Sequence, residues 1–90
     1  MQHFILMRFK VKEYTNFRLE FDPHIEFRKN MGEKYCHIFS DTDNLNKVTV
    51  LFEWKSLEAA KDFISDPYLS EILQIAGVLD QPRVHLLIKE

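Results

Sequence analysis

The sequence predicts an α+β fold of the ferredoxin-like class, in which the elements follow the order β-α-β-β-α-β. Four segments alternate apolar and polar residues with the period of two that half-buried strands show. Two segments between them place apolar residues three and four positions apart, which is the spacing of one helix face. The strand–helix–strand order occurs twice within 90 residues, a length that accommodates one domain, 1–90.

The first strand is predicted over residues 4–12. Phe4 and Leu6 begin one of its faces, which then becomes basic toward the end of the strand. The other face is continuously apolar, and this face is expected to cover the core. Its residues are Ile5, Met7, Phe9 and Val11.

The first helical segment is predicted over residues 15–31. Thr15 or Asn16 is the expected N-cap, and Gly32 suits the position just past the end. Pro23 interrupts the segment, because proline inside a helix removes a hydrogen bond and clashes with the preceding turn. We therefore expect either a kink at Pro23 or two short helices that meet there. The predicted apolar stripe comprises Tyr14, Phe17, Phe21 and Ile25.

The second and third strands are predicted over residues 34–40 and 47–54, with a turn at 41–44. On the second strand, one face carries Tyr35, His37 and Phe39, and the other carries Cys36 and Ile38. On the third strand, Val48, Val50, Phe52 and Trp54 alternate with Lys47, Thr49, Leu51 and Glu53.

The second helical segment and the last strand complete the pattern. A helix is predicted from Ser56, a strong N-cap, to about residue 65. A second short helix begins at Asp66-Pro67 and ends at Gly77. The last strand is predicted over residues 83–89.

The predicted sheet is four-stranded and antiparallel, and two right-handed crossovers place both helical segments on one of its faces. A sheet whose other face meets water alternates cleanly between apolar and polar residues, but several of these strands are apolar on both faces. We therefore expect a homodimer in which two sheets pack face to face. The doubly apolar positions are Phe4 and Leu6 against Ile5 and Met7, Leu51 against Val50 and Phe52, and Leu87 against Leu86 and Ile88.

The composition limits the classes of binding partner and the cellular location that are expected. Hydrophobic residues make up 46% of the chain, including eight Phe, three Tyr and one Trp, a large apolar load that favours association with a second chain. The net charge of -2 does not favour binding to nucleic acid or to an anionic membrane. Cys36 is the only cysteine, and we find no signal-peptide or membrane-span pattern, so a cytoplasmic location is expected.

Five motifs are distributed over most of the chain. They are Phe21-Asp22-x-His24-x-x-x-Arg28-x-x-x-Gly32, Val48-Thr49-Val50-Leu51-Phe52-Glu53-Trp54, Leu57-Glu58-Ala59-Ala60-x-x-Phe63, Ser65-Asp66-Pro67-x-Leu69 and Ala76-Gly77-Val78. Together they resemble small single-domain members of the dimeric α/β-barrel superfamily, which includes antibiotic-biosynthesis-monooxygenase-like and muconolactone-isomerase-like proteins. The resemblance implies a ferredoxin-like protomer, a dimer whose sheets form a barrel, and a pocket between the sheet and the helices of each protomer.

The sequence departs from the haem-degrading members of that superfamily. Those members carry a Trp in the strand before the second helix and a His within that helix. Trp54 resembles the first of these residues, but Phe63 and Ile64 occupy the region of the second. Haem degradation is therefore not expected, and neither is any other cofactor.

A candidate catalytic pair lies on the first helical segment. His24 and Arg28 are four residues apart, so both project from one side of a helix, beside Phe17 and Phe21. This arrangement fits a pocket in which His24 transfers a proton and Arg28 orients a polar group. The alternative is a half-buried histidine at a helix edge and a solvated arginine.

Two further residues are candidates for contact with a ligand, together with Phe17 and Phe21. If the face of the second strand that carries His37 meets the first helix, His37 and His24 converge; the alternative is a histidine satisfied by a neighbour on the sheet. Trp54 is either a pocket wall or a core residue. A metal site is not expected, because no His-x-His or Cys-x-x-Cys spacing occurs.

Three functions remain open, and the sequence does not decide whether the protein is an enzyme. The first is a binding module for a small, largely apolar molecule. The second is a cofactor-independent monooxygenase or isomerase acting on an aromatic or polyketide-like substrate. The third is a purely structural role. An apolar pocket without His24 or His37 favours the first, a pocket with both favours the second, and a closed interior favours the third.

Overall fold

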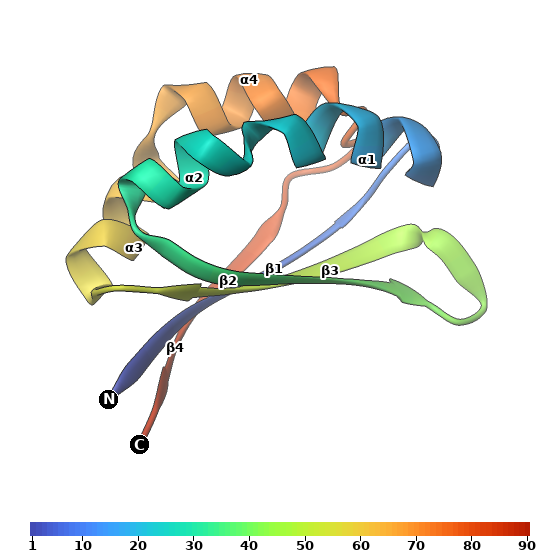
Figure 1. The fold of residues 1–90 in the computed structure, drawn as a ribbon. Helices are drawn as coiled ribbons and strands as arrows, with labels where there is room; N and C mark the ends of the chain where they lie inside the picture. Colours follow the sequence, from blue (N-terminus) through green and yellow to red (C-terminus); the bar gives the residue numbers. More distant parts are fainter.

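The computed structural model describes all 90 residues and shows one antiparallel sheet with the helices on one of its faces (Figure 1). The strand order is β2-β3-β1-β4, so the first and third strands are central. This arrangement confirms the predicted ferredoxin-like fold. The strands are β1 (Gln2–Lys10), β2 (Glu33–Asp41), β3 (Asn44–Trp54) and β4 (Arg83–Lys89).

The strands extend beyond their predicted limits in several places. The strand β1 starts at Gln2 and ends at Lys10, two residues earlier at each end than predicted, and Val11 makes an isolated bridge with Val78. The strand β3 begins at Asn44, because it pairs with β2 almost to the turn. The predicted core face of β1 is nevertheless correct, since Ile5, Met7, Phe9 and Val11 are all buried.

The first helical segment is divided at Pro23, as expected. It consists of α1 (Tyr14–Phe21), a 3₁₀ turn (Asp22–His24) and α2 (Ile25–Met31). Gly32 follows α2 with φ 121°, a conformation that glycine adopts without strain. The predicted cap was wrong: the carboxylate of Glu13 accepts a hydrogen bond from the backbone nitrogen of Asn16, at 2.7 Å.

The predicted apolar stripe is correct on α1 and wrong on α2. Phe17 and Phe21 are buried, but Ile25 is 41% exposed and Arg28 is buried instead. Arg28 is seven residues, close to two helical turns, from Phe21 and therefore projects on the side of Phe17 and Phe21, whereas Ile25 lies at the edge of that stripe.

The second helical segment follows its prediction closely. It comprises α3 (Leu57–Ser65) and α4 (Pro67–Ile75). The hydroxyl of Ser56 accepts a hydrogen bond from the backbone nitrogen of Ala59, and the carboxylate of Asp66 accepts one from that of Tyr68. No helix in the structure has the length and apolar character needed to cross a bilayer.

The hydrophobic core fills the layer between the sheet and the helices. It contains 17 buried apolar residues, drawn from β1, β3 and every helix except α2, together with Val11 and Ala76 beside them. The opposite sheet face has no cover from this chain (Figure 1). On that face, Tyr35 is 63% exposed, Phe39 is 54% exposed and Leu87 is 44% exposed.

Candidate functional site

An aromatic cluster surrounds Trp54 between the sheet and the helices. The ring of Phe63, on α3, lies 4.6 Å from that of Trp54, and Phe52 lies 6.2 Å from it, measured between centroids. Trp54 is 1% exposed, and its indole Nε1 has no hydrogen-bond partner. This N–H is the one buried side-chain donor without a partner. A buried polar group without a partner costs about 1–3 kcal/mol.

Arg28 lies at the edge of this cluster in a buried ion pair. Its Nε donates a hydrogen bond to Oε1 of Glu33 at 2.8 Å, and its Nη1 donates one to the carbonyl of Phe21 at 3.0 Å. The guanidinium also lies over the ring of Phe21, 4.3 Å from its centroid. These contacts fix the side chain and join the end of α2 to the start of β2. The solvated arginine of the alternative reading is therefore wrong.

His24 is half-buried at the end of the 3₁₀ turn that precedes α2. Its Nδ1 is 3.4 Å from the hydroxyl of Tyr68, and the two rings meet edge to face. Tyr68 in turn packs edge to face on Phe27, at 4.6 Å between centroids. The structure therefore places His24 beside the ring of Tyr68, at the border of the interior and not within it.

His37 does not join this group. It is exposed on the open face of the sheet, where its register partner is Leu51, while Cys36 and Ile38 pack against the core. His24 and His37 thus lie on opposite sides of the sheet. The two predicted aromatic contacts of the first helix, Phe17 and Phe21, stack at 5.1 Å within the core.

Cys36 faces the helices from β2 and is half-buried. Burial raises the pKa of its thiol from 9.0 to about 11, and the negative charge of Glu33 adds to the shift. Between these two pH values, the Cys36 thiol therefore keeps its proton in the folded chain and loses it in the unfolded chain. The resulting contribution to stability is complete below pH 9.0 and is lost as the pH rises from there to about 11.

Alkylation of Cys36 by iodoacetamide at pH 8 is expected to be about a hundredfold slower in the folded protein than in urea, because the thiolate is the reactive form. The rate in the folded protein should still be rising at pH 10. A folded-state rate that has levelled off by pH 10, as it does for a thiol whose pKa is 9.0, would show that the thiol is not shielded. Mass spectrometry of the adduct against time provides the measurement.

The open face of the sheet contains an apolar hollow of about 480 Å³. Apart from Lys89, its lining is apolar, and neither His24 nor His37 contributes to it. The register places Phe4 beside Leu87 and Leu6 beside Leu51, so these four side chains form a continuous strip across three strands. The lining residues of the hollow are Phe4, Leu51, Leu87, Ile88 and Lys89.

Two residues of the helix-side group escaped the sequence reasoning. Glu33 follows Gly32, and only the turn at the helix end brings its carboxylate back to Arg28. Tyr68 is 44 residues from His24, and no local spacing relates the two. The one available signal was that charged residues are seldom buried unless they are paired, which becomes useful only once Arg28 is known to be buried.

Comparison with known proteins gives matches by structure only. No family model matches the sequence, and no curated protein matches it significantly. A protein assigned as an antibiotic biosynthesis monooxygenase from Bordetella bronchiseptica superposes with a TM-score of 0.83 at 13% identity, over 99% of this chain and 97% of that one.

Two further solved structures are named for their activity. SnoaB, a cofactor-independent oxygenase from Streptomyces nogalater, superposes with a TM-score of 0.80 at 15% identity, over 99% of this chain and 93% of that one. A monooxygenase from the gene ActVA-Orf6 of Streptomyces coelicolor, in complex with nanaomycin D, superposes with a TM-score of 0.71 at 16% identity, over 99% and 88%. The resemblance predicted from the sequence is confirmed at the level of the fold: this chain has the ferredoxin-like architecture of antibiotic-biosynthesis-monooxygenase-like structures.

Proposed function

We propose that this protein binds a small, largely apolar aromatic molecule between its helices and its sheet, beside Trp54. The observation that carries the proposal is the unpaired, buried Nε1–H of Trp54 within a cluster of aromatic rings. A carbonyl or hydroxyl oxygen of the ligand accepts this hydrogen bond and removes the penalty of the unsatisfied donor. The rings of the cluster supply the apolar walls that small-molecule sites require.

Access to this site runs through the surface layer beside α2. Phe27 and Met31 are only partly buried, and Tyr68 is 41% exposed, so these side chains cover the cluster without being locked into it. The helix α2 has seven residues and is separated from α1 by the 3₁₀ turn. Rotation of the Tyr68 ring together with that of Phe27 admits the ligand while the Arg28–Glu33 pair holds the end of α2 in place, and His24 then lies at the mouth.

The functional unit in this proposal is a homodimer. The strip formed by Phe4, Leu6, Leu51 and Leu87 leaves an apolar surface exposed on one protomer, and a second copy of the chain covers it. The apolar hollow on the same face accepts side chains of the partner. The dimer and the site beside Trp54 use opposite faces of the sheet, so neither blocks the other.

A second candidate function is cofactor-independent oxygenation of the bound aromatic molecule. Its support is the fold shared with SnoaB and with the ActVA-Orf6 protein, whose names state oxygenase activity. In this chain His24 would transfer the proton, and Trp54 or Arg28 would orient the substrate. An isomerase of an aromatic or polyketide-like substrate would use the same groups.

A fluorescence titration tests the binding proposal, because Trp54 is the only tryptophan. Aromatic quinones, nanaomycin D among them, are expected to quench its emission saturably. By calorimetry, Trp54→Phe should weaken binding about fivefold to tenfold, the loss of one hydrogen bond, and Tyr14→Phe should leave it unchanged. Quenching that stays linear up to a ligand concentration of about 1 mM would reject the site, because any dissociation constant would then exceed that value.

An oxygen electrode distinguishes the two candidates in the same solutions. Oxygen uptake that depends on both the protein and the quinol form of the ligand supports the oxygenase. His24→Gln should then lower the rate of uptake while the fluorescence titration stays the same. Saturable binding without any uptake leaves the binding function alone.

A further inference from the structure

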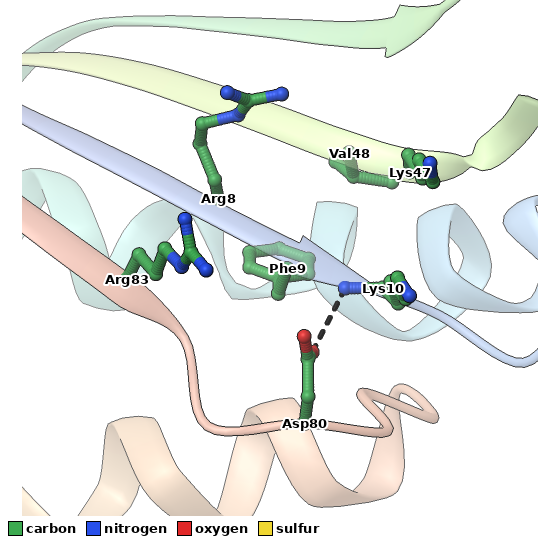
Figure 2. A pocket seen from close by; sticks show the side chains of 7 residues that line it. All are labelled: Arg8, Phe9, Lys10, Lys47, Val48, Asp80 and Arg83. Atoms are coloured by element: carbon green, nitrogen blue, oxygen red, sulfur yellow. Dashed lines mark hydrogen bonds between the residues drawn. The ribbon is translucent and has the colours of Figure 1, made fainter.

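Four basic side chains surround a second hollow, of about 300 Å³, at the other end of the open sheet face (Figure 2). The register places Arg8 directly opposite Arg83, and Lys10 directly opposite Lys47. Like charges in directly opposed cross-strand positions destabilise a sheet. Two such pairs lie side by side here, although the net charge of the chain is -2. This concentration of positive charge is therefore local, and a bound anion would neutralise it.

The carboxylates nearby do not supply that counter-charge. Oδ1 of Asp80 accepts a hydrogen bond from the backbone nitrogen of Lys10, at 2.9 Å, which holds the loop before β4 against β1. Oδ1 of Asp41 is 3.9 Å from Nη2 of Arg8, at the outer limit of an ion pair. Two carboxylates thus lie among the four basic side chains. One of the two, that of Asp80, already accepts a hydrogen bond from the backbone.

The floor of this hollow is fixed by the fold. Pairing between β1 and β4 stops at Arg8 and Arg83, and beyond that point Leu79 donates a backbone hydrogen bond to the carbonyl of Lys10. Together with the hydrogen bond that Asp80 accepts from Lys10, this contact holds the loop at the edge of the hollow. Figure 2 shows the four basic side chains around the backbone of β1, with the helices behind the sheet.

We propose that this hollow binds the phosphate group of a small molecule. Arginine presents a planar fork of donors that matches phosphate oxygens, and lysine adds compact positive charge, so the four side chains together suit a doubly charged oxyanion. Arg8 is two residues from Leu6, the nearest residue of the apolar strip on β1, roughly 7 Å at 3.3 Å per residue, so the hollow lies at the rim of that strip. The site is separate from the cluster around Trp54, which lies on the other face.

The test measures stabilisation by inorganic phosphate at constant ionic strength. Phosphate is expected to raise the melting temperature and to bind saturably in calorimetry. The double variant Arg8→Gln with Lys47→Gln should weaken this binding at least tenfold. The control is Lys29→Gln with Lys61→Gln, which removes the same charge from exposed positions on α2 and α3 and should change the affinity less than twofold.

Three outcomes overturn the proposal. The first is equal stabilisation by chloride and by phosphate, and the second is an equal loss of affinity in the control variant. The third is tighter binding of citrate than of phosphate, which would assign the hollow to carboxylates. If the double variant does not fold, amide chemical shifts of the unaltered protein decide: phosphate should move those of residues 8–10, 47–48 and 80–83, and shifts confined to other residues would reject the site.

Discussion

The substitution Arg28→Met is expected to lower the free energy of unfolding by about 3–5 kcal/mol. It removes the guanidinium from the buried pair with Glu33, whose side chain is 2% exposed, and leaves a carboxylate in the interior without its counter-charge. The carbonyl of Phe21 loses a hydrogen bond at the same time. Urea denaturation followed by circular dichroism measures the change.

Two comparisons isolate the cause of this loss. Arg18→Met removes an exposed partner from the i,i+4 pair with Asp22 and should cost no more than about 1 kcal/mol. The double variant Arg28→Met with Glu33→Leu removes both charges and should recover most of the stability. If Arg28→Met alone is as stable as Arg18→Met, the buried pair does not anchor α2 to β2.

The substitution Leu51→Lys is expected to convert the proposed dimer into a monomer. Leu51 lies in the middle of the apolar strip, beside Leu6 on the neighbouring strand. In a face-to-face dimer with two-fold symmetry, the lysine enters the interface twice, and each ammonium must lose its water or push the sheets apart. The dissociation constant should rise at least a hundredfold, about 2.7 kcal/mol.

Sedimentation velocity at micromolar concentration measures this change. Leu19→Lys is the matched control, because Leu19 is 65% exposed on α1, away from the sheet, and its variant should sediment as the unaltered protein does. Equal sedimentation of both variants as dimers would place the interface elsewhere. An unaltered protein that is already monomeric would remove the dimer from the proposal altogether.

The sheet was predictable because the alternation of apolar residues along each strand indicates which face packs against the helices. Val48, Val50, Phe52 and Trp54 occupy alternate positions of β3, and every one of the four is buried. A strand with one buried face shows apolar residues at every second position, whichever element covers that face. The strands and their inner face can therefore be predicted from the sequence of a single chain. The same reasoning found the apolar residues on the outer face, but it does not say what covers them.

The candidate site was less predictable, because it depends on geometry between distant segments. Helical spacing does set Arg28 on the side of Phe17 and Phe21, but it does not show that Ile25 is exposed or that a buried guanidinium finds its partner in Glu33. His37 shares a strand face with Tyr35 and Phe39, and only the pairing of β2 with β3 shows that this face is the open one. The unpaired N–H of Trp54 likewise appears only when its surroundings are known.

Native mass spectrometry of protein purified without additives tests the central claim most directly, because it reports assembly and bound ligand together. The chain has a mass of 10.8 kDa. We predict a species of twice that mass that retains a small molecule, with at most one copy per chain and a lower occupancy in Trp54→Phe. A species of 10.8 kDa alone, without any added mass, would contradict this prediction.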